Sequence, residues 1–554
     1  MTKLEKLELD VRGMTCASCG QHVSRALQSV PGVVEAEVPG WQSSRATVVA
    51  APEVSEAALA EAVAAAGYQA RVVARRSLAD QPVGNGAGPA DFDLLVIGAG
   101  SGGFAAAIKG AELGGRVGLI NDGTLGGTCV NVGCVPSKAL IRAAEAWHKA
   151  GHHPFRGVTT RQIALDWDAV RRQKDELMAD LRQEKYADVL AAYPEITFIP
   201  GRARFQPDGS VLVDDRVIRA RKYVITTGAR PRMLPIPGTE EAGVLNSTTL
   251  MDLPELPRSL IVLGGRAVAL ELGQTMARFG VQVTVLQRSS RLIPDHEPEI
   301  ARALKGYLEK EGIGVVAGVQ VERIEREGNQ RVVHACVQGR PMAYRAGQVL
   351  MALGRQPNTA GMDLEAVGVE LDQNGAIIVD GQMRTSNPDI YASGDCTINP
   401  EFVYVAAAGG AIAVENALTG AGRVLDLSAM PAVIFTDPQV ATVGLTEAQA
   451  REASYDVETS MLLLSYVPRA LAARDTRGLI KLVADGATGR LLGAHILAAE
   501  AGEVVQSAVL AVKFGLTLDD LTGTLFPYLT QVEGLKLAAQ AFSKDMAKLS
   551  CCAA

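Results

Sequence analysis

The feature that most constrains the fold is an apolar strand followed directly by a glycine-rich turn and a helix, which occurs twice. The first copy runs Asp93-Leu-Leu-Val-Ile-Gly98-Ala-Gly100-Ser-Gly-Gly103, and the second begins at Ser259-Leu-Ile-Val-Leu-Gly264. Gly98 permits the tight turn, Gly100 lets a pyrophosphate approach the backbone, and Gly103 allows the helix to pack closely. Two such units predict an α/β body with two Rossmann-like nucleotide-binding domains.

Length, charge and the start of the chain limit the class of protein. The 554 residues are enough for about three to four domains, and 57 glycines suit an α/β protein with many turns. A net charge of −7 without a dense Lys/Arg block argues against nucleic acid as a partner. The sequence has no run of about 18 apolar residues and no signal-peptide pattern. We therefore expect a cytoplasmic protein without a transmembrane helix.

The first 76 residues are expected to form a small domain of their own. Their strand and helix patterns follow the order βαββαβ, which is typical of a ferredoxin-like fold. Residues 77–90 are rich in Gly, Pro and small side chains and lack an apolar period, which predicts a flexible linker. The α/β body begins after this linker.

Six of the eight cysteines lie in three close pairs, and in a reducing compartment such pairs are more often metal-binding or catalytic than structural. The first pair, in Gly13-Met-Thr-Cys16-Ala-Ser-Cys19, lies at an expected strand–helix junction, where backbone N–H groups favour thiolates. Two soft thiolates select a soft ion such as Cu(I) or Hg(II), although a pair of half-buried structural cysteines is the alternative. The segment resembles the heavy-metal-associated domain, which implies metal capture by Cys16 and Cys19. Outside the pairs, Cys336 and Cys396 are expected to be buried apolar residues.

The second pair lies in Leu125-Gly-Gly-Thr-Cys129-Val-Asn-Val-Gly-Cys134-Val-Pro-Ser-Lys138, directly after the first nucleotide-binding unit. The spacing places the thiols at a helix start, where a lowered pKa favours the reactive thiolate, and an ordinary disulfide is the alternative. With the two glycine-rich turns, this segment resembles the pyridine nucleotide-disulfide oxidoreductases. The resemblance implies that Cys129 exchanges with substrate and that Cys134 contacts a flavin. It also implies that Lys138 holds positive charge near the flavin and pairs with Glu271, which faces the nicotinamide.

The same resemblance implies FAD as the first cofactor. The segments Thr226-Thr-Gly-Ala229 and Thr385–Asp395 are similar to two later FAD motifs of the family, in which the aspartate binds the ribityl chain. The strand at 116–120 ends at Asn121-Asp122, where an acid usually binds the adenosine ribose, and whether Asp122 takes this role stays open. The residues expected at FAD are Gly98, Gly100, Gly103, Gly123, Thr128, Lys138, Ala229, Asp395 and Val403.

The second glycine-rich turn predicts the site of the electron donor. It reads Gly264-Gly-Arg-Ala-Val-Ala-Leu-Glu271, so that an arginine and an alanine replace the middle and last glycines. The paired strand at 281–286 is followed by Arg288 and Arg291, whereas an NAD site requires an acid there for the 2′-hydroxyl. Arginine suits a 2′-phosphate, which favours NADPH over NADH. The alternative is that both arginines are only solvated surface charges.

The C-terminal end decides which substrate the resemblance implies. Family members that exchange organic disulfides carry a histidine base near this end, oriented by a glutamate. This chain keeps Glu533 but has Tyr528 in the place of the histidine. The third pair, Cys551 and Cys552, is expected to bind a soft ion on a mobile tail. A second disulfide relay, as in thioredoxin reductases, and a tail without function are the alternatives.

The resemblance covers essentially the whole chain and implies its domain order and a homodimer. After the domain at 1–76 and the linker at 77–90, four parts are expected. They are an FAD-binding part at 91–230, an NADPH-binding domain at 231–355, a second FAD or central part at 356–428, and an α+β dimerisation domain with the cysteine tail at 429–554.

Together these features predict a flavoenzyme of mercury detoxification that reduces thiol-bound Hg(II) to Hg(0) with electrons from NADPH through FAD. Cys16 and Cys19 would collect the ion, and Cys551 and Cys552 of the partner subunit would carry it to the central pair. A membrane mercury transporter is an expected further partner. Two alternatives stay open: an NADPH-dependent disulfide reductase with a metal-chaperone appendage, and a metal-binding carrier whose flavin body is vestigial.

Overall fold

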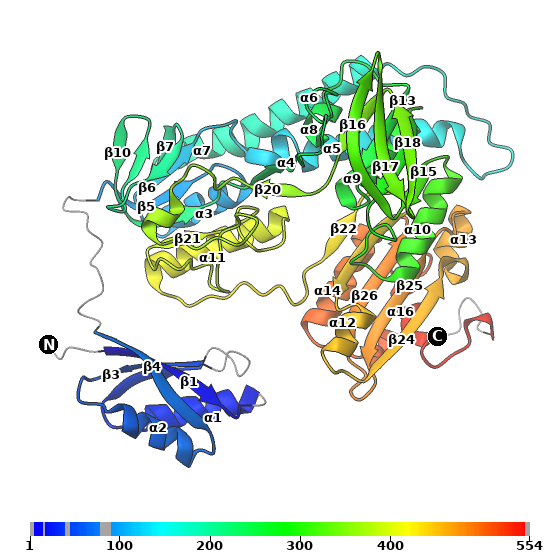
Figure 1. Ribbon diagram of the computed structural model, residues 1–554. Helices are drawn as coiled ribbons and strands as arrows, with labels where there is room; N and C mark the ends of the chain where they lie inside the picture. Colours follow the sequence, from blue (N-terminus) through cyan, green and yellow to red (C-terminus); the bar gives the residue numbers. More distant parts are fainter. Residues whose placement is uncertain (1–4, 15–16, 39–44, 78–89, 549–554) are drawn as a thin grey trace. The chain divides into compact units, whose positions relative to one another are not determined.

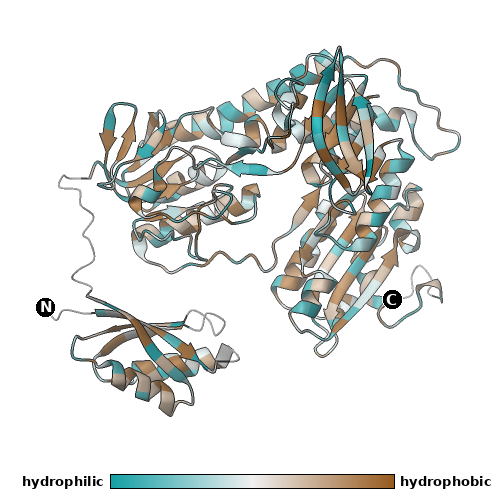
Figure 2. Cartoon of the chain, in the orientation of Figure 1, coloured by the Kyte–Doolittle hydropathy of each residue, from teal (hydrophilic) through white to brown (hydrophobic). Residues whose placement is uncertain are grey.

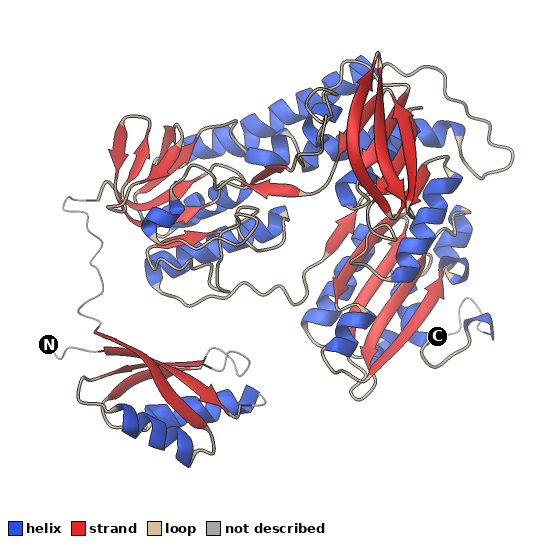
Figure 3. Ribbon diagram, in the orientation of Figure 1, coloured by secondary structure: helices blue, strands red, loops and turns tan. Residues whose placement is uncertain are grey.

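The computed structural model describes residues 5–14, 17–38, 45–77 and 90–548. Most of the expected linker at 77–90 falls outside these residues, and so do Cys16, Cys551 and Cys552. The chain divides into two compact units, Met1–Gly88 and Pro89–Ala554, and each is described by itself (Figure 1). Both units combine helices and strands (Figure 3).

The small unit has a four-stranded antiparallel sheet in the order β2-β3-β1-β4, with both helices on one face (Figure 1). Leu7 and Leu9 of β1 point to the same face because strand side chains alternate, and both are fully buried against Val23, Leu59 and Val63. The elements follow the expected βαββαβ order. They are β1 (Glu5–Arg12), α1 (Ala17–Gln28), β2 (Val33–Glu37), β3 (Arg45–Ala50), α2 (Glu56–Ala65) and β4 (Gln69–Ser77).

The first nucleotide-binding domain has a parallel five-stranded sheet in the order β21-β11-β5-β6-β7. Helices α3 (Ser101–Glu112) and α11 (Val403–Thr419) pack closely on each other, because a Cβ on Gly410 would lie 2.3 Å from the carbonyl oxygen of Gly102. The strands are β5 (Phe92–Ile97), β6 (Val117–Asn121), β7 (Ile196–Pro200), β11 (Ala220–Ile225) and β21 (Ile390–Ala392), with a meander of β8 (Ala203–Phe205), β9 (Val211–Val213) and β10 (Arg216–Ile218) beside them.

Several helices and two short strands link this domain to the next one. They are α4 (Gly127–Asn131), α5 (Cys134–Gly151), α6 (Trp167–Arg182), α7 (Asp188–Ala192), β12 (Ala229–Pro231), α8 (Ser247–Met251) and β20 (Arg355–Pro357). Strands β12 and β20 pair with each other, so the chain leaves and re-enters the first domain at one place.

The second nucleotide-binding domain repeats the pattern with a parallel sheet in the order β15-β14-β13-β19. An antiparallel meander, which the sequence patterns did not predict, lies beside it. The sheet consists of β13 (Ser259–Leu263), β14 (Gln282–Gln287), β15 (Gly314–Ala317) and β19 (Gln348–Met351), the meander of β16 (Val319–Glu327), β17 (Gln330–Val337) and β18 (Arg340–Ala346), and the helices are α9 (Ala267–Arg278) and α10 (Pro298–Lys310).

The C-terminal domain is built on an antiparallel sheet in the order β22-β23-β26-β25-β24. All seven residues of β25, which lies between β26 and β24, are buried. The elements are β22 (Ala432–Ile434), β23 (Gln439–Gly444), α12 (Glu447–Glu452), β24 (Val457–Leu463), α13 (Pro468–Ala473), β25 (Leu479–Asp485), β26 (Leu491–Ala498), α14 (Ala501–Lys513), α15 (Leu518–Gly523) and α16 (Glu533–Gln540).

A buried ion cluster joins the C-terminal domain to the second nucleotide-binding domain. The ammonium of Lys481, on β25, lies 2.8 Å from carboxylate oxygens of both Glu297 and Glu447, and 3.2 Å from Glu299. Lys481 and Glu297 are almost fully buried, so each charge depends on the other for stabilisation.

The strands of the parallel sheets are apolar along most of their length, as buried strands require (Figure 2). Among the described residues, none of the helices combines the length and the apolar character needed to span a bilayer. The predicted class, two Rossmann-like domains and an α+β domain preceded by a ferredoxin-like domain, is confirmed.

Candidate functional site

The first glycine-rich turn is packed too tightly for any other residue at two positions. A Cβ on Gly103 would lie 1.8 Å from the carbonyl oxygen of Gly98, and Gly98 itself has a φ of 109°. Thr226 stabilises the turn by donating a hydrogen bond of 2.9 Å from its hydroxyl to the same oxygen. At Gly100, in contrast, a Cβ would meet only the Cα of Gly127, at 3.7 Å. The backbone at Gly100 is therefore open to a ligand.

A cavity of about 420 Å³ lies beside this turn and fits the adenosine part of FAD. Its wall includes the glycine turn at Gly98, the end of β6 at Asn121 and Asp122, and Thr227. The carboxamide of Asn121 accepts a hydrogen bond of 3.1 Å from the amide of Ala99 and donates one of 2.6 Å to the carbonyl of Gly123. Because Asn121 is occupied in this way, exposed Asp122 is the carboxylate that lines the cavity.

The residues expected around the rest of FAD meet at a half-buried arginine, Arg355, that the sequence reasoning missed. Arg355, at the start of β20, lies 3.3 Å from the Asp395 carboxylate, 3.4 Å from the Thr128 hydroxyl, and donates a hydrogen bond to the carbonyl of Ala229. Burial raises the pKa of Asp395. The available signal was a charged residue four positions after the apolar strand at 348–351. Val403 begins α11 and is partly exposed.

The two central cysteines lie on either side of a break between two helices. Cys129 is in α4 and is half-buried, whereas Cys134 is the first residue of α5 and is exposed. Both are thiols in this structure, and a hydrogen bond between them lowers the pKa of Cys134 to about 6, with a further contribution from the charge of Lys138. The same hydrogen bond and burial raise the pKa of Cys129. The pair therefore shares one proton at neutral pH, with the negative charge on Cys134.

Lys138 lies one turn after Cys134 on α5 and forms an ion pair with Glu271 on α9. The ammonium is 2.7 Å from one carboxylate oxygen of Glu271, and the other oxygen accepts a hydrogen bond of 2.9 Å from the amide of Phe435. The ammonium also lies 4.6 Å from the centre of the Phe435 ring. Glu271 is almost fully buried. Three domains thus fix one positive charge beside the cysteine pair.

The second glycine-rich turn precedes α9 and fits a dinucleotide. Gly264 has a φ of 118°, and a Cβ there would lie 2.4 Å from the carbonyl oxygen of Ala352. The two expected phosphate-binding arginines differ in their surroundings. Arg288 is exposed, whereas Arg291 donates hydrogen bonds to the carbonyls of Pro294 and His296 in its own loop.

The C-terminal segment carries Tyr528 and Glu533 together. Tyr528 is half exposed, and the Glu533 carboxylate accepts a hydrogen bond of 3.2 Å from the amide of Leu529.

Two further cysteines are buried. Cys19 lies in the small unit, and burial raises the pKa of Cys396, in the first nucleotide-binding domain, to about 11. Across the described ranges, no three His, Cys, Asp or Glu side chains form a group that could hold a metal ion.

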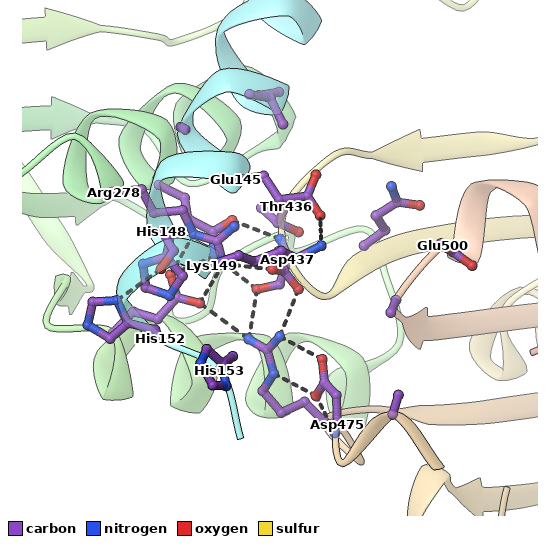
Figure 4. Close-up of a pocket in the computed structure, with 18 of the residues that line it drawn as sticks. Glu145, His148, Lys149, His152, His153, Arg278, Thr436, Asp437, Asp475 and Glu500 are labelled. Atoms are coloured by element: carbon purple, nitrogen blue, oxygen red, sulfur yellow. Dashed lines mark hydrogen bonds and ion pairs between the residues drawn. The ribbon is translucent and has the colours of Figure 1, made fainter. Parts of the chain in front are cut away.

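A second cavity, of about 1090 Å³, extends from Lys138 to Gln531 between α5, α9 and the C-terminal domain (Figure 4). Its wall contains an ion network in which Arg278 lies 2.8 Å from Asp437. Burial and the nearby Arg278 charge lower the pKa of His148, which also lines the cavity. The cavity connects the helix of the cysteine pair with the segment that carries Tyr528.

Comparison with known proteins agrees with this arrangement. The family described as pyridine nucleotide-disulphide oxidoreductase matches residues 92–410, its dimerisation domain matches residues 430–539, and the heavy-metal-associated domain matches residues 8–69. The chain belongs to the pyridine nucleotide-disulphide oxidoreductase family, as the sequence predicted, and its cofactors are FAD and NADPH.

The chain is also similar over its full length to proteins named mercuric reductase. It is 43% identical to the one from Lysinibacillus sphaericus, over 99% of this chain and 100% of that protein. The one from Staphylococcus aureus is 42% identical over 99% of both chains, and the one from Acidithiobacillus ferrooxidans is 43% identical over 100% of both. Among solved structures, the HOCl-induced flavoprotein disulfide reductase RclA from Escherichia coli is 32% identical, with a TM-score of 0.73 over 81% of this chain and 99% of that one.

Proposed function

We propose that this protein is a mercury(II) reductase, which converts thiol-bound Hg(II) to Hg(0) with electrons from NADPH. The observation that carries the proposal is the pair of free cysteines, Cys129 and Cys134, which share a hydrogen bond beside a lysine held by a buried glutamate. Two soft sulfur ligands suit Hg(II), and full-length similarity to proteins named mercuric reductase supports the same substrate. The C-terminal Tyr528, where exchange of organic disulfides would require a base, argues against such disulfides.

The two central cysteines bind the ion one after the other. Cys129, the cysteine expected to exchange with substrate, displaces one thiolate from Hg(SR)₂ and passes its proton to that leaving thiolate. The Cys134 thiolate then displaces the second ligand, so the ion stays bound to two sulfurs throughout. When bound beside this pair, FAD would supply the two electrons that reduce Hg(II) to Hg(0), with NADPH as their source.

The ion pair of Lys138 and Glu271 keeps positive charge beside the thiolate. Glu271 is buried and tied to the Phe435 amide, so the ammonium cannot move away without leaving a buried carboxylate unpaired. Lys138 therefore stabilises the thiolate of Cys134 whenever its sulfur is not bound to mercury.

The remaining cysteine pairs extend the path. Cys16 and Cys19 collect Hg(II), and Cys551 and Cys552 of the partner subunit pass it to the central pair, where Tyr528 is the hydroxyl nearest the metal. The homodimer that this route needs is supported by the match to a dimerisation domain and by exposed apolar side chains in that domain, including Phe514 and Leu525. A membrane mercury transporter is the proposed source of the ion.

Purified enzyme with NADPH and Hg(II) in excess thiol tests the central proposal. Mercury-dependent oxidation of NADPH with release of Hg(0) is expected, and Cys129→Ala and Cys134→Ala should each abolish it. Cys336→Ala, on β17 in another domain, is the matched control and should keep full activity. Turnover with an organic disulfide but not with mercury would instead identify the disulfide reductase with a metal-binding appendage.

Mixing two inactive proteins tests the transfer between subunits. One carries Cys129→Ala with Cys134→Ala, and the other carries Cys551→Ala with Cys552→Ala. After dissociation and reassociation, hybrid dimers combine an intact tail with an intact central pair, so turnover of mercury bound to bulky thiols should return. If the mixture stays as inactive as its parents although hybrid dimers form, the tail does not act across the interface.

A further inference from the structure

Arg266 stands where the glycine pattern of a dinucleotide-binding turn has its middle glycine. It is the N-cap residue directly before α9, with extended backbone angles and no hydrogen bond from its side chain to the helix end. The guanidinium instead forms an ion pair with Asp295. Both side chains are mostly exposed, at 62% and 60%. A long cation thus replaces the residue type that normally leaves this place empty.

The loop after β14 is folded back onto the turn and brings Asp295 to Arg266. The amide of Ile293 donates a hydrogen bond of 2.8 Å to the carbonyl of Gly265, which fixes the middle of the loop against the turn. Arg291 holds the end of the loop through the carbonyls of Pro294 and His296. These contacts fix the backbone on both sides of Asp295, so the loop keeps Asp295 beside the turn without relying on its ion pair with Arg266.

The hydrogen bonds of Arg291 leave two other arginines at this edge that can bind phosphate. Arg291 is engaged with its own loop, so Arg288 remains as the exposed cation after β14. Arg266 is the other cation at this edge, and it lies at the end of the helix whose free N–H groups and dipole favour the pyrophosphate of a dinucleotide. A guanidinium binds phosphate oxygens through paired hydrogen bonds.

We propose that Arg266 binds the pyrophosphate of NADPH, and that Asp295 is the counter-ion from which it must be released. The inference rests on the use of NADPH by this chain. An exposed ion pair contributes little because water screens it, so a pyrophosphate with two negative charges can displace the carboxylate. Asp295 then lowers the affinity for the dinucleotide by competing for Arg266, which lets NADP⁺ leave after each hydride transfer.

Calorimetric titration of the FAD-loaded, oxidised enzyme with NADP⁺ and with adenosine 2′-monophosphate tests the proposal. Arg266→Ala should raise the Kd of NADP⁺ about tenfold, as loss of one charge-assisted contact predicts. The Kd of adenosine 2′-monophosphate, which has no pyrophosphate, should not change. Asp295→Asn should lower the Kd of NADP⁺ about threefold, the value of one exposed ion pair. Arg266→Lys should restore part of the affinity.

Two further variants distinguish competition by Asp295 for Arg266 from other causes of a changed Kd. In Arg266→Ala/Asp295→Asn, the gain from Asp295→Asn should vanish, because no guanidinium is left to release; a gain that persists would mean direct repulsion by Asp295 and overturn the proposal. Arg345→Ala removes an ion pair of similar exposure, with Glu327, in the meander of the same domain and should leave both Kd values unchanged.

Equal loss of affinity for NADP⁺ and adenosine 2′-monophosphate in Arg266→Ala would assign Arg266 to the 2′-phosphate and refute the pyrophosphate contact. An unchanged Kd of NADP⁺ with a lowered melting temperature would make the ion pair purely structural and refute it too. Mercury-dependent oxidation of NADPH by the unmodified enzyme, measured on the same preparation, decides the proposed function independently.

Discussion

Cys129→Ala should move the titration of Cys134 upward by removing the hydrogen bond that does most to stabilise its thiolate. The pKa of Cys134 is lowered from 9.0 to about 6, first by the thiol of Cys129 and then by the Lys138 charge, while burial and Glu271 act in the opposite direction. At pH 7, about nine-tenths of a thiol with a pKa of about 6 is ionised, compared with about one in a hundred at 9.0. Lys138 remains in the variant, but burial and Glu271 oppose it and together outweigh it, so we expect the pKa to return to about 9.0 or above.

The rate of alkylation at a single pH would underestimate the rise in the pKa of Cys134. A thiolate of higher pKa is a stronger nucleophile, with a Brønsted coefficient of about 0.4–0.5, so a roughly 90-fold loss of thiolate becomes only a loss of about fivefold in rate. The midpoint of the pH dependence reports the pKa directly. Alkylation of the reduced holoenzyme with iodoacetamide from pH 4.5 to 10, with mass spectrometry to locate the label, measures it for Cys134 alone.

A second variant should shift the pKa of Cys134 in the opposite direction, which makes the test stricter. Glu271→Gln removes a carboxylate that raises the pKa of Cys134, so its midpoint should fall below that of the unmodified enzyme. Cys336→Ala should not move it. A midpoint that stays near 6 in Cys129→Ala would refute the reasoning, because the hydrogen bond would then not be the main cause.

Three further substitutions test the glycine-rich turn at FAD, the buried ion cluster and the role of Tyr528. Gly103→Ala should abolish FAD binding, measured by flavin absorbance after gel filtration, because its Cβ would lie 1.8 Å from the Gly98 oxygen. Lys481→Met should destabilise the protein by about 3 kcal/mol in denaturant unfolding, since it leaves the buried carboxylate of Glu297 without its partner. Tyr528→Phe should lower mercury turnover about tenfold, as loss of one hydroxyl contact predicts, without changing reduction of the flavin by NADPH.

Each of these changes has a matched control in the same chain. Gly306→Ala, in α10, adds a methyl group with no atom within 4 Å and should keep FAD. Lys305→Met removes an exposed ion pair and should cost less than about 1 kcal/mol. Tyr466→Phe alters another half-exposed tyrosine of the C-terminal domain and should keep mercury turnover. Equal losses in a variant and its control would contradict the corresponding explanation.

Local chemistry explains why so much of the fold could be predicted. The turns at Gly98 and Gly264 need backbone angles or contacts that only glycine allows, so the sequence shows where each nucleotide-binding unit begins. Strands and helices of the small domain follow from alternation and periodicity within short segments. The meander at 319–346 was missed, because a register shift between Val321 and Arg323 interrupts the alternation of apolar and polar residues in β16.

The sequence by itself determined the residue types of this protein: three cysteine pairs, two glycine-rich turns and a tyrosine in place of a histidine. Only the tertiary structure decided which groups act on one another. It joined Arg355 to Asp395, turned Arg291 toward its own loop and set Arg266 against Asp295. These outcomes depend on burial and on distances between segments far apart in the chain, because charge and hydrogen-bond energies are fixed by packing and not by composition.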